Sequence, residues 1–190
     1  KTLITLHNIG RALQTQGKLE EAEPLLRDGL ARARAKYGDA DRSTILLIEA
    51  LATNCRRLNQ VEDADRLCNE SLRLNRAVYG DDAVPALTAR QRLAEFYIER
   101  SRFAEAVPLA EDLVRRAGKS RDPIAAGLTT WQINLAKCYA GLDRFADAER
   151  LLTNAHDAAP ESEKGRLAAA MIELLEFRGD AADSTASRAD

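Results

Sequence analysis

The sequence repeats itself at a spacing of 42 residues, and this periodicity restricts the fold more than any other feature. Residues of matched size recur in four copies, in columns such as Ile9/Leu51/Leu93/Leu135 and Gly10/Ala52/Ala94/Ala136. Two further columns keep one residue type throughout, namely Ala22/Ala64/Ala106/Ala148 and Leu25/Leu67/Leu109/Leu151. Repetition at a fixed spacing of this length is typical of solenoids, in which each copy is one small unit that stacks on the next.

The spacing of apolar residues within one copy predicts two helices. Leu6, Ile9 and Leu13 follow the helical period, and a second apolar stripe begins at Leu19. Between the helices lies a column of turn residues that tolerate left-handed backbone geometry or cap a helix with a side-chain oxygen: Gly17, Asn59, Ser101 and Asp143. Gly38 and Gly80 are expected to end the second helix of their copies. Each copy is therefore predicted to be a helical hairpin.

Small residues on both helices explain how the hairpins pack. Gly10 and Ala22, with their equivalents, let two helix axes approach closely, so we expect Ala64, Ala106 and the neighbouring Leu109 to be buried. One hairpin cannot bury both of its faces, and the copies must stack. The predicted fold is all-α, a right-handed superhelical solenoid of antiparallel helix hairpins, in which the first helices line a concave face.

These columns resemble the tetratricopeptide repeat (TPR), which has a small residue in its first helix and Ala in its second. The spacing is longer than the ~34 residues of most TPRs. Together with the segment Gln16–Leu25 (QGKLEEAEPL), it resembles the repeats of kinesin light chains. The resemblance implies a protein-interaction scaffold that binds a peptide or an extended protein segment along its first helices. It also implies a regulatory or partner-recruiting part of a larger bacterial signalling protein, such as a Ser/Thr kinase.

The repeats divide the chain into a single predicted domain, residues 1–178, with a frayed or truncated tail at 179–190. Four complete copies are expected at about 2–40, 43–82, 85–118 and 123–160, and a partial fifth at 161–178. In the fifth copy Gly179 takes the turn position. The chain begins with Lys1 rather than Met, which favours a fragment of a longer protein.

Composition excludes several classes of function. A net charge of −2, with 31% of residues charged, lacks the basic surplus that nucleic-acid binding requires. No apolar run reaches the ~20 residues of a membrane span. Three cysteines without metal-ligand spacing favour reduced thiols and a cytoplasmic location. Because His7 and His156 lie in distant copies and no phosphate-binding loop is present, we expect neither an enzyme nor a cofactor or metal site.

The outward columns of the first helices change chemistry from copy to copy while the packing columns do not. They include the position of Gln14 and the candidate groove residues His7, Asn8, Arg11, Glu49, Arg92, Glu95, Asn134 and Lys137. The Lys and Asn residues with which some TPRs clamp a C-terminal carboxylate are incomplete here. We therefore expect a mixed-charge peptide ligand, held mainly by Asn134, Arg92 and Lys137. The alternative is self-association as a weak homodimer, or intramolecular regulation, through the convex or terminal faces.

Overall fold

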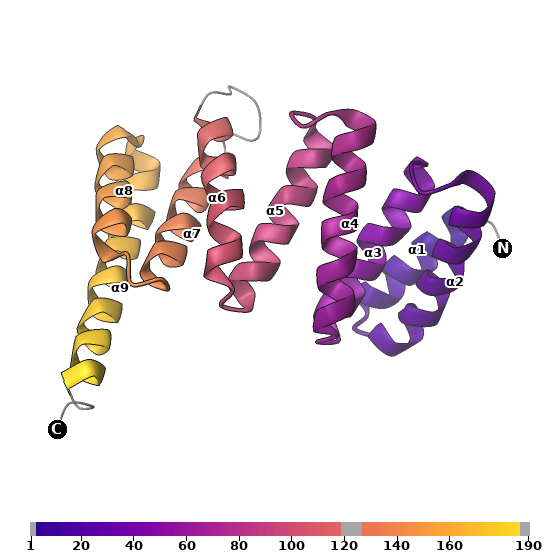
Figure 1. Cartoon of the computed structure of the whole chain (residues 1–190), viewed down its shortest axis with the longest axis horizontal. Coiled ribbons are helices and arrows are strands. Elements are labelled where there is room, and N and C mark those ends of the chain that lie inside the picture. The colour runs from indigo at the N-terminus through magenta and orange to yellow at the C-terminus, as the bar shows by residue number, and fades with distance from the viewer. Residues whose placement is uncertain (1–2, 119–126, 187–190) are drawn as a thin grey trace. The chain divides into compact units, whose positions relative to one another are not determined.

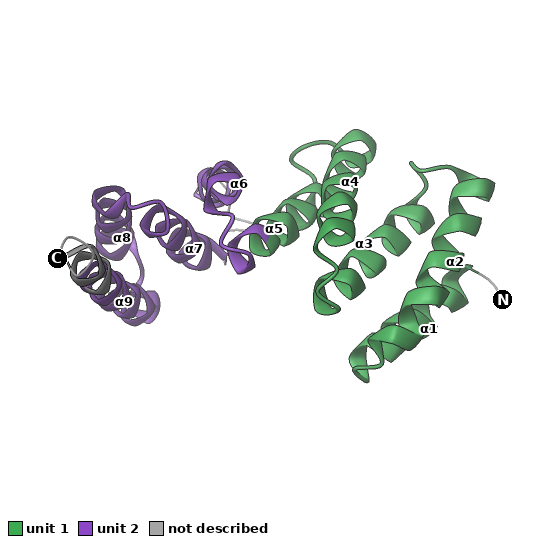
Figure 2. Ribbon diagram, turned by 60° about the horizontal axis from the view of Figure 1, so that its bottom comes forward, with its two compact units in different colours: residues 1–96 green, residues 97–190 purple. Residues whose placement is uncertain are grey.

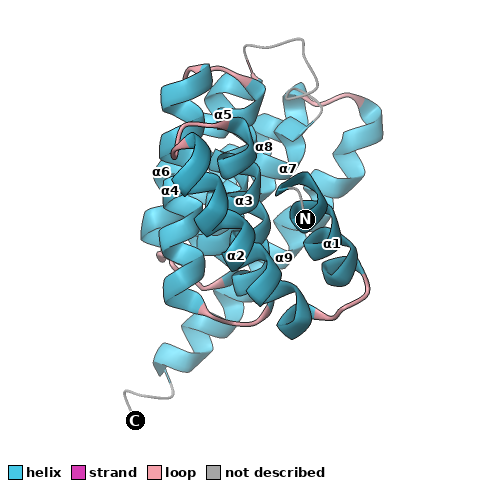
Figure 3. Cartoon of the chain, turned by 90° about the vertical axis from the view of Figure 1, so that its right-hand side faces the viewer, coloured by secondary structure: helices cyan, strands magenta, loops and turns pink. Residues whose placement is uncertain are grey.

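The computed structural model describes residues 3–118 and 127–186, which form helices and no strand (Figures 1 and 3). In chain order the helices are α1 (Leu3–Thr15), α2 (Leu19–Tyr37), α3 (Arg42–Arg57), α4 (Val61–Tyr79), α5 (Val84–Glu99), α6 (Phe103–Ala117), α7 (Leu128–Ala140), α8 (Phe145–Ala158) and α9 (Glu161–Ala186). The prediction of an all-α repeat fold is confirmed. The connector between the third and fourth predicted copies, residues 119–122, lies outside the described ranges.

The chain divides into two compact units, residues 1–96 and 97–190 (Figure 2). In unit 1, α1 packs on α2 and α3, and α3 packs on α2 and α4. In unit 2, α7 packs on α6, α8 and α9, and α9 also packs on α8. The prediction that residues 1–178 form one solenoid domain stays a prediction.

The turns within the four hairpins have the same backbone geometry. The turn residues all have left-handed φ values, 77° at Gly17, 60° at Asn59, 54° at Ser101 and 60° at Asp143. In every turn the following amide donates to a carbonyl five residues earlier, as Lys18 N does to Leu13 O at 2.9 Å. The turn residue's own amide donates to a carbonyl three residues earlier, as Gly17 N does to Gln14 O at 3.1 Å. These two bonds define a Schellman motif. Each turn residue therefore ends the first helix of its hairpin through its left-handed backbone conformation, and not as a side-chain cap.

Glycine ends the long second helix in the first two hairpins. Gly38 has φ 80° and ψ 174°, and Gly80 has φ 92° and ψ 158°. A side chain at this combination of angles is strained, which explains why glycine stands at both positions. After the first hairpin, α3 begins within a few residues of Gly38. The carboxylate of Asp41 accepts a hydrogen bond from Ser43 N at 2.8 Å and caps the N-terminus of α3.

The alanine column of the second helices is fully buried. Ala22, Ala64, Ala106 and Ala148 are all 0% exposed, which confirms the prediction for Ala64 and Ala106. The prediction for Leu109 is wrong, because this side chain is only half-buried. In α6 the buried residues include Ala106, Ala110 and Leu113, and Leu109 lies about 60° around the helix from Ala106, at the edge of this stripe. Leu113 is therefore the large residue of this core.

Helix α9, the first helix of the predicted fifth copy, is longer than expected. The sequence predicts a turn at Gly179, whereas α9 continues without interruption from Glu161 to Ala186. Glycine is a weak helix former, at about 1 kcal/mol below alanine, but one glycine between good formers does not end a helix unless a packed partner helix requires a turn. Ala181 and Ala182 follow Gly179 and favour helix.

The left-handed geometry at Ser101 leads to a first prediction. Replacing Ser101 by Gly relieves the cost of a left-handed L residue, ~1–2 kcal/mol, and part of this gain is offset by the entropy of glycine. We expect Ser101→Gly to raise the free energy of unfolding by up to ~1 kcal/mol in urea titrations. The matched control is Ala104→Gly, an exposed site in the first turn of α6, which should lower it by less than the ~1 kcal/mol of a helix interior. A destabilised Ser101→Gly protein would contradict the shared turn geometry.

The corrected core of α6 leads to a second prediction. Leu113→Ala removes a side chain that is 0% exposed, and the resulting cavity should cost ~2–5 kcal/mol of unfolding free energy. Leu109→Ala changes the same residue type on the same helix at a half-buried site, and should cost distinctly less. Chemical denaturation followed by circular dichroism measures both. Equal losses for the two variants would restore the original column assignment.

Candidate functional site

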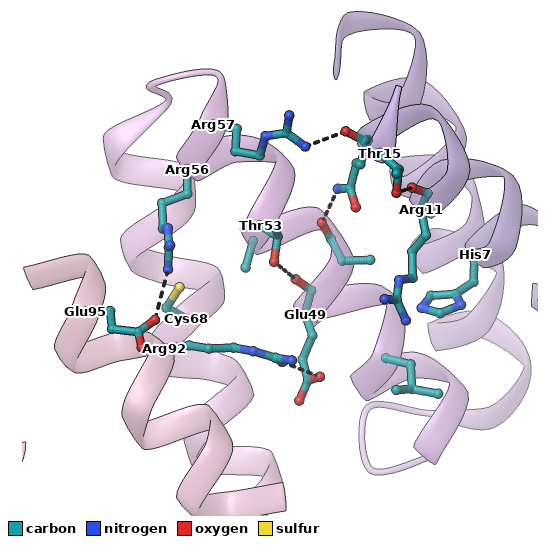
Figure 4. Close-up of a pocket in the computed structure, with 14 residues that line it drawn as sticks. His7, Arg11, Thr15, Glu49, Thr53, Arg56, Arg57, Cys68, Arg92 and Glu95 are labelled. Carbon is teal, nitrogen blue, oxygen red and sulfur yellow. Dashed lines mark hydrogen bonds and ion pairs between the residues drawn. The ribbon is translucent and has the colours of Figure 1, made fainter. Parts of the chain in front are cut away.

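The first helices of unit 1 surround a groove with a volume of about 490 Å³ (Figure 4). Its walls come from α1, α3 and α5, and Cys68 of α4 closes one side. We call it the unit 1 groove. Its lining residues are His7, Arg11, Gln14, Thr15, Leu46, Glu49, Ala50, Ala52, Thr53, Arg56, Arg57, Cys68, Arg92 and Glu95.

Five of the eight candidate groove residues lie together in this groove. They are His7, Arg11, Glu49, Arg92 and Glu95. A sixth, Asn8, is exposed on α1, and its side-chain oxygen lies 3.3 Å from Nδ1 of His7. Successive first helices place the same columns side by side, which is why a sequence pattern could bring these residues together. Their role in binding stays a prediction.

The other two candidate residues belong to unit 2. Asn134 is half-buried on α7, and Nζ of Lys137 lies 3.4 Å from a carboxylate oxygen of Glu173. Lys137 and Glu173 line a second pocket of about 370 Å³, whose other walls are apolar side chains such as Ile133 and Phe177. This pocket differs from the unit 1 groove, where charged and polar side chains together predominate.

Glu49 is the best-anchored charge of the unit 1 groove. Its side chain is 17% exposed, and one carboxylate oxygen accepts from Nη1 of Arg92 at 2.7 Å. The other oxygen accepts from the buried Asn75 Nδ2 at 3.1 Å and the buried Ser71 Oγ at 3.3 Å. Figure 4 shows Arg92 extended from α5 toward this carboxylate. The negative charge of Glu49 is thus held by donors of two other helices.

Buried polar side chains join the first two hairpins at one end of the groove. Nε2 of Gln14 donates to the carbonyl of Ala50 at 2.8 Å and to the side chain of Asn54 at 3.2 Å. Asn54 in turn donates to the carbonyl of Leu19 at 3.0 Å. The sequence assigned Gln14 to an outward column, and this is wrong, since Gln14 is only 7% exposed. Column spacing alone gave no sign that Asn54 accepts this amide.

The four arginines of the groove differ in what they bind. Arg92 pairs with Glu49, and Arg56 lies 4.0 Å from Glu95. Nη1 of Arg57 donates to the backbone carbonyl of Gln14 at 2.5 Å. Within the part of the chain that the structure describes, no carboxylate pairs with Arg57 and no hydrogen bond or ion pair reaches the guanidinium of Arg11. The groove therefore carries a positive surplus, located on Arg11 and Arg57.

The cysteines are buried and free. Burial raises the pKa of the Cys68 thiol, next to the groove, to about 11, and it does the same for Cys55 and Cys138. These thiols stay protonated at neutral pH and are poor nucleophiles. Over residues 3–118 and 127–186, no group of three or more His, Cys, Asp or Glu side chains could hold a metal ion. The same ranges contain no helix with the length and apolarity to cross a membrane.

Comparison with protein families identifies the repeats. A family model described as tetratricopeptide repeat matches residues 2–43, and a second one with the same description matches residues 41–119. Together they cover more than half of the chain. The chain is a TPR protein. No match is found among curated proteins.

Solved structures agree on the fold of this TPR protein. The kinesin light chain TPR-like repeats of Podosopora anserina, which are nearly identical to one another, share 19% identity with a TM-score of 0.79, covering 96% of this chain and 90% of theirs. A variant of the same repeats gives the same identity and TM-score, with coverages of 96% and 89%. BtubC (BKLC) from P. vanneervenii shares 17% identity with a TM-score of 0.72, covering 89% of this chain and 64% of its own. At these identities the likeness concerns the fold.

Membership of the family carries a general function. TPRs generally mediate protein–protein interactions, and proteins with this fold are typically scaffolds without enzymatic activity. The unit 1 groove, with a volume of about 490 Å³ on the first helices, is the candidate surface for such an interaction.

The anchoring of Glu49 leads to a third prediction. Glu49→Ala removes a carboxylate that accepts from Asn75, Ser71 and Arg92, and the loss of these three bonds should cost ~1–3 kcal/mol of unfolding free energy. The control is Glu95→Ala in the same groove, an exposed residue with a long 4.0 Å ion pair, and it should cost less than ~1 kcal/mol. Urea titrations of both variants measure the difference. If the two losses are equal, Glu49 is a surface charge and not part of the framework.

Proposed function

We propose that this TPR protein binds an extended segment of a protein partner in the unit 1 groove, and that this segment carries acidic residues. The observation that supports the proposal is the positive surplus of the groove. Arg11 and Arg57 have no carboxylate partner among the described residues, whereas Arg56 and Arg92 do. A guanidinium binds a carboxylate through two parallel hydrogen bonds, which adds geometric specificity to charge attraction.

Charge pairing within the groove favours an acidic ligand over the mixed-charge peptide suggested by the sequence. Glu49 is already neutralised by Arg92 and bound by Asn75. A basic ligand residue would have to displace Arg92 from a partly buried 2.7 Å ion pair. An acidic residue needs no such displacement, because Arg11 is free to turn toward it.

The remaining lining residues suit a ligand held by both its side chains and its backbone. Leu46 is 38% exposed and offers an apolar contact. His7 presents an imidazole that can donate or accept a hydrogen bond. Figure 4 shows His7 and Arg11 next to each other on α1, across the groove from Arg92. An extended segment between these walls could meet α1 on one side and α5 on the other.

Asn134 and Lys137 are not needed for this proposal, since they belong to unit 2 and lie by a pocket of different chemistry. The assignment of the repeats to a larger signalling protein, such as a bacterial Ser/Thr kinase, also stays a prediction. A partner-recruiting groove is compatible with such a larger protein.

Fluorescence anisotropy with labelled peptides of equal length tests the proposal. The probes are a Glu/Asp-rich, a mixed-charge and a Lys-rich peptide, each of extended character. We expect the acidic probe to bind most tightly and to weaken as salt is added, because screening reduces attraction between exposed charges. Arg11→Glu/Arg57→Glu should weaken it by about tenfold or more, equivalent to ~1.4 kcal/mol.

Arg32→Glu is the matched control for this charge reversal. Arg32 is an exposed arginine of the same unit, but it lies on α2 outside the groove and pairs with Asp28 at 2.9 Å. The control should bind the acidic probe as the wild type does. Equal binding by the groove variant and the wild type, or a preference for the Lys-rich probe, would reject the unit 1 groove as an acidic-segment site.

A further inference from the structure

The last helix of unit 2 has one covered face and one bare face. Leu167, Ala170 and Leu174 of α9 are buried in the core that α9 forms with α7 and α8. On the other side Ile172 is 59% exposed and Leu175 is 57% exposed. We call the residues on this side, Gly165, Ala168, Ala169, Ile172, Leu175 and Glu176, the bare face of α9.

Ion pairs and hydrogen bonds confirm which sides of α9 are occupied. Arg166 donates to Thr130 of α7 at 2.9 Å, and Glu173 pairs with Lys137 of α7 at 3.4 Å. On the side of α8, Arg178 lies 3.6 Å from Glu149. A helix advances about 100° per residue, so Ile172 and Gly165 point away from both of these neighbours.

The bare face corresponds to a helix-packing face in the preceding repeat. Aligned by the repeat pattern, Ile172 and Leu175 occupy the positions of Ala136 and Tyr139 in α7. In α7 these two residues belong to the core shared with Leu152 of α8. The bare face is therefore of the kind that packs against another helix, and two large aliphatic side chains on it are exposed without one.

Residue size along the bare face is self-complementary. Its N-terminal half holds only small residues, Gly165, Ala168 and Ala169, and its C-terminal half holds Ile172 and Leu175. A Cβ built at Gly165 would meet no atom within 4 Å, so the surface above it is open. Two such helices in antiparallel orientation place the large half of each against the small half of the other, so that ridges enter grooves.

Charge selects the same orientation. Arg166 lies beside the small half, and Glu176 beside the large half. An antiparallel pair brings Glu176 of one copy next to Arg166 of the other, on the same flank. The guanidinium of Arg166 already donates to Glu163 and Thr130, but it has five N–H groups and can also donate to a further carboxylate. A parallel pair would instead bring Glu176 of one copy to the same height as Glu176 of the other, and like charges repel.

We propose that a second copy of this chain covers the bare face, and that two α9 helices pack antiparallel about a two-fold axis near Ala170 and Met171. The interface is isologous, so it closes as a dimer and does not propagate into a filament. Ile172 and Leu175 bury their side chains over Ala168 and Gly165 of the second copy. One helix pair is a small interface, and the dimer is correspondingly weak and dependent on concentration.

Sedimentation equilibrium of the 190-residue chain over a concentration series tests the proposal. We expect a reversible monomer–dimer equilibrium. Ile172→Glu/Leu175→Glu should leave the chain monomeric at every concentration, with an unchanged circular dichroism spectrum because both residues are exposed in the monomer. Ile4→Glu is the matched control, since Ile4 is 69% exposed but lies on α1, and it should dimerise as the wild type does.

Charge exchange tests the orientation of the two helices. Glu176→Arg and Arg166→Glu should each weaken the dimer several-fold, and the double variant should restore it, because exchanged charges still meet across an antiparallel pair. A chain that is monomeric throughout the series overturns the proposal. So does a dimer that persists in Ile172→Glu/Leu175→Glu, an assembly larger than two copies, or a double variant as weak as the single ones.

Discussion

The packing of the two helices within a hairpin, of α1 on α2, α3 on α4 and α7 on α8, is the contact on which the rest of the structure depends. In these three hairpins the alanine column of the second helix, Ala22, Ala64 and Ala148, has no exposed surface. In the first hairpin the side chain of Leu26 fills the space beside Gly10, where a Cβ would lie 2.5 Å from one of its methyl groups. These contacts use the inner faces of the two helices, so they leave the outer surface of the first helix free to vary.

The contacts between hairpins are of a different kind, because several of them are polar and lie at the groove. Gln14 reaches the second hairpin through Ala50 and Asn54, and Glu49 reaches Arg92 of the third. Buried polar groups are costly when one partner is lost, so these bonds hold neighbouring hairpins in a defined register. The framework therefore uses part of the charge that the groove would otherwise offer to a ligand. What it leaves over is carried by Arg11 and Arg57.

The sequence was most informative where structure is determined locally. Gly17, Asn59, Ser101 and Asp143 were assigned to a turn, and all four end a helix in left-handed geometry. The small-residue columns were equally readable, because a periodic position on a helix defines a face. Leu109 and Gln14 were misplaced because a repeat position fixes the direction of a side chain around the helix only approximately. Whether a side chain at the edge of a helix face is buried depends on the neighbouring hairpin. The turn expected at Gly179 is replaced by continuous helix, and among the described residues no helix follows α9 to pack back on it.

The grouping of His7, Arg11, Glu49, Arg92 and Glu95 was also predictable, since stacked copies bring equal columns together. Their pairing was not. That Glu49 is held by Asn75 and Ser71 depends on side chains of α4, which no column of the first helices contains. The division between neutralised and available arginines, on which recognition depends, is therefore a tertiary property.

The two units show how one packing scheme carries two surface chemistries. The column of His7 and Glu49 in unit 1 continues as Ile133 in unit 2, and the column of Arg56 continues as Ile98. His7, Glu49 and Arg56 line the charged unit 1 groove, whereas Ile98 and Ile133 line the apolar pocket of unit 2. Over the same interval the alanine column is unchanged. Since the residues that hold the helices together are not those that face the hollow, a substitution in an outward column alters what the surface can bind at little cost to the fold. This separation also has a limit, which Gln14 and Glu49 mark: an outward residue that bonds to the next hairpin cannot be exchanged freely, because it belongs to both the surface and the framework.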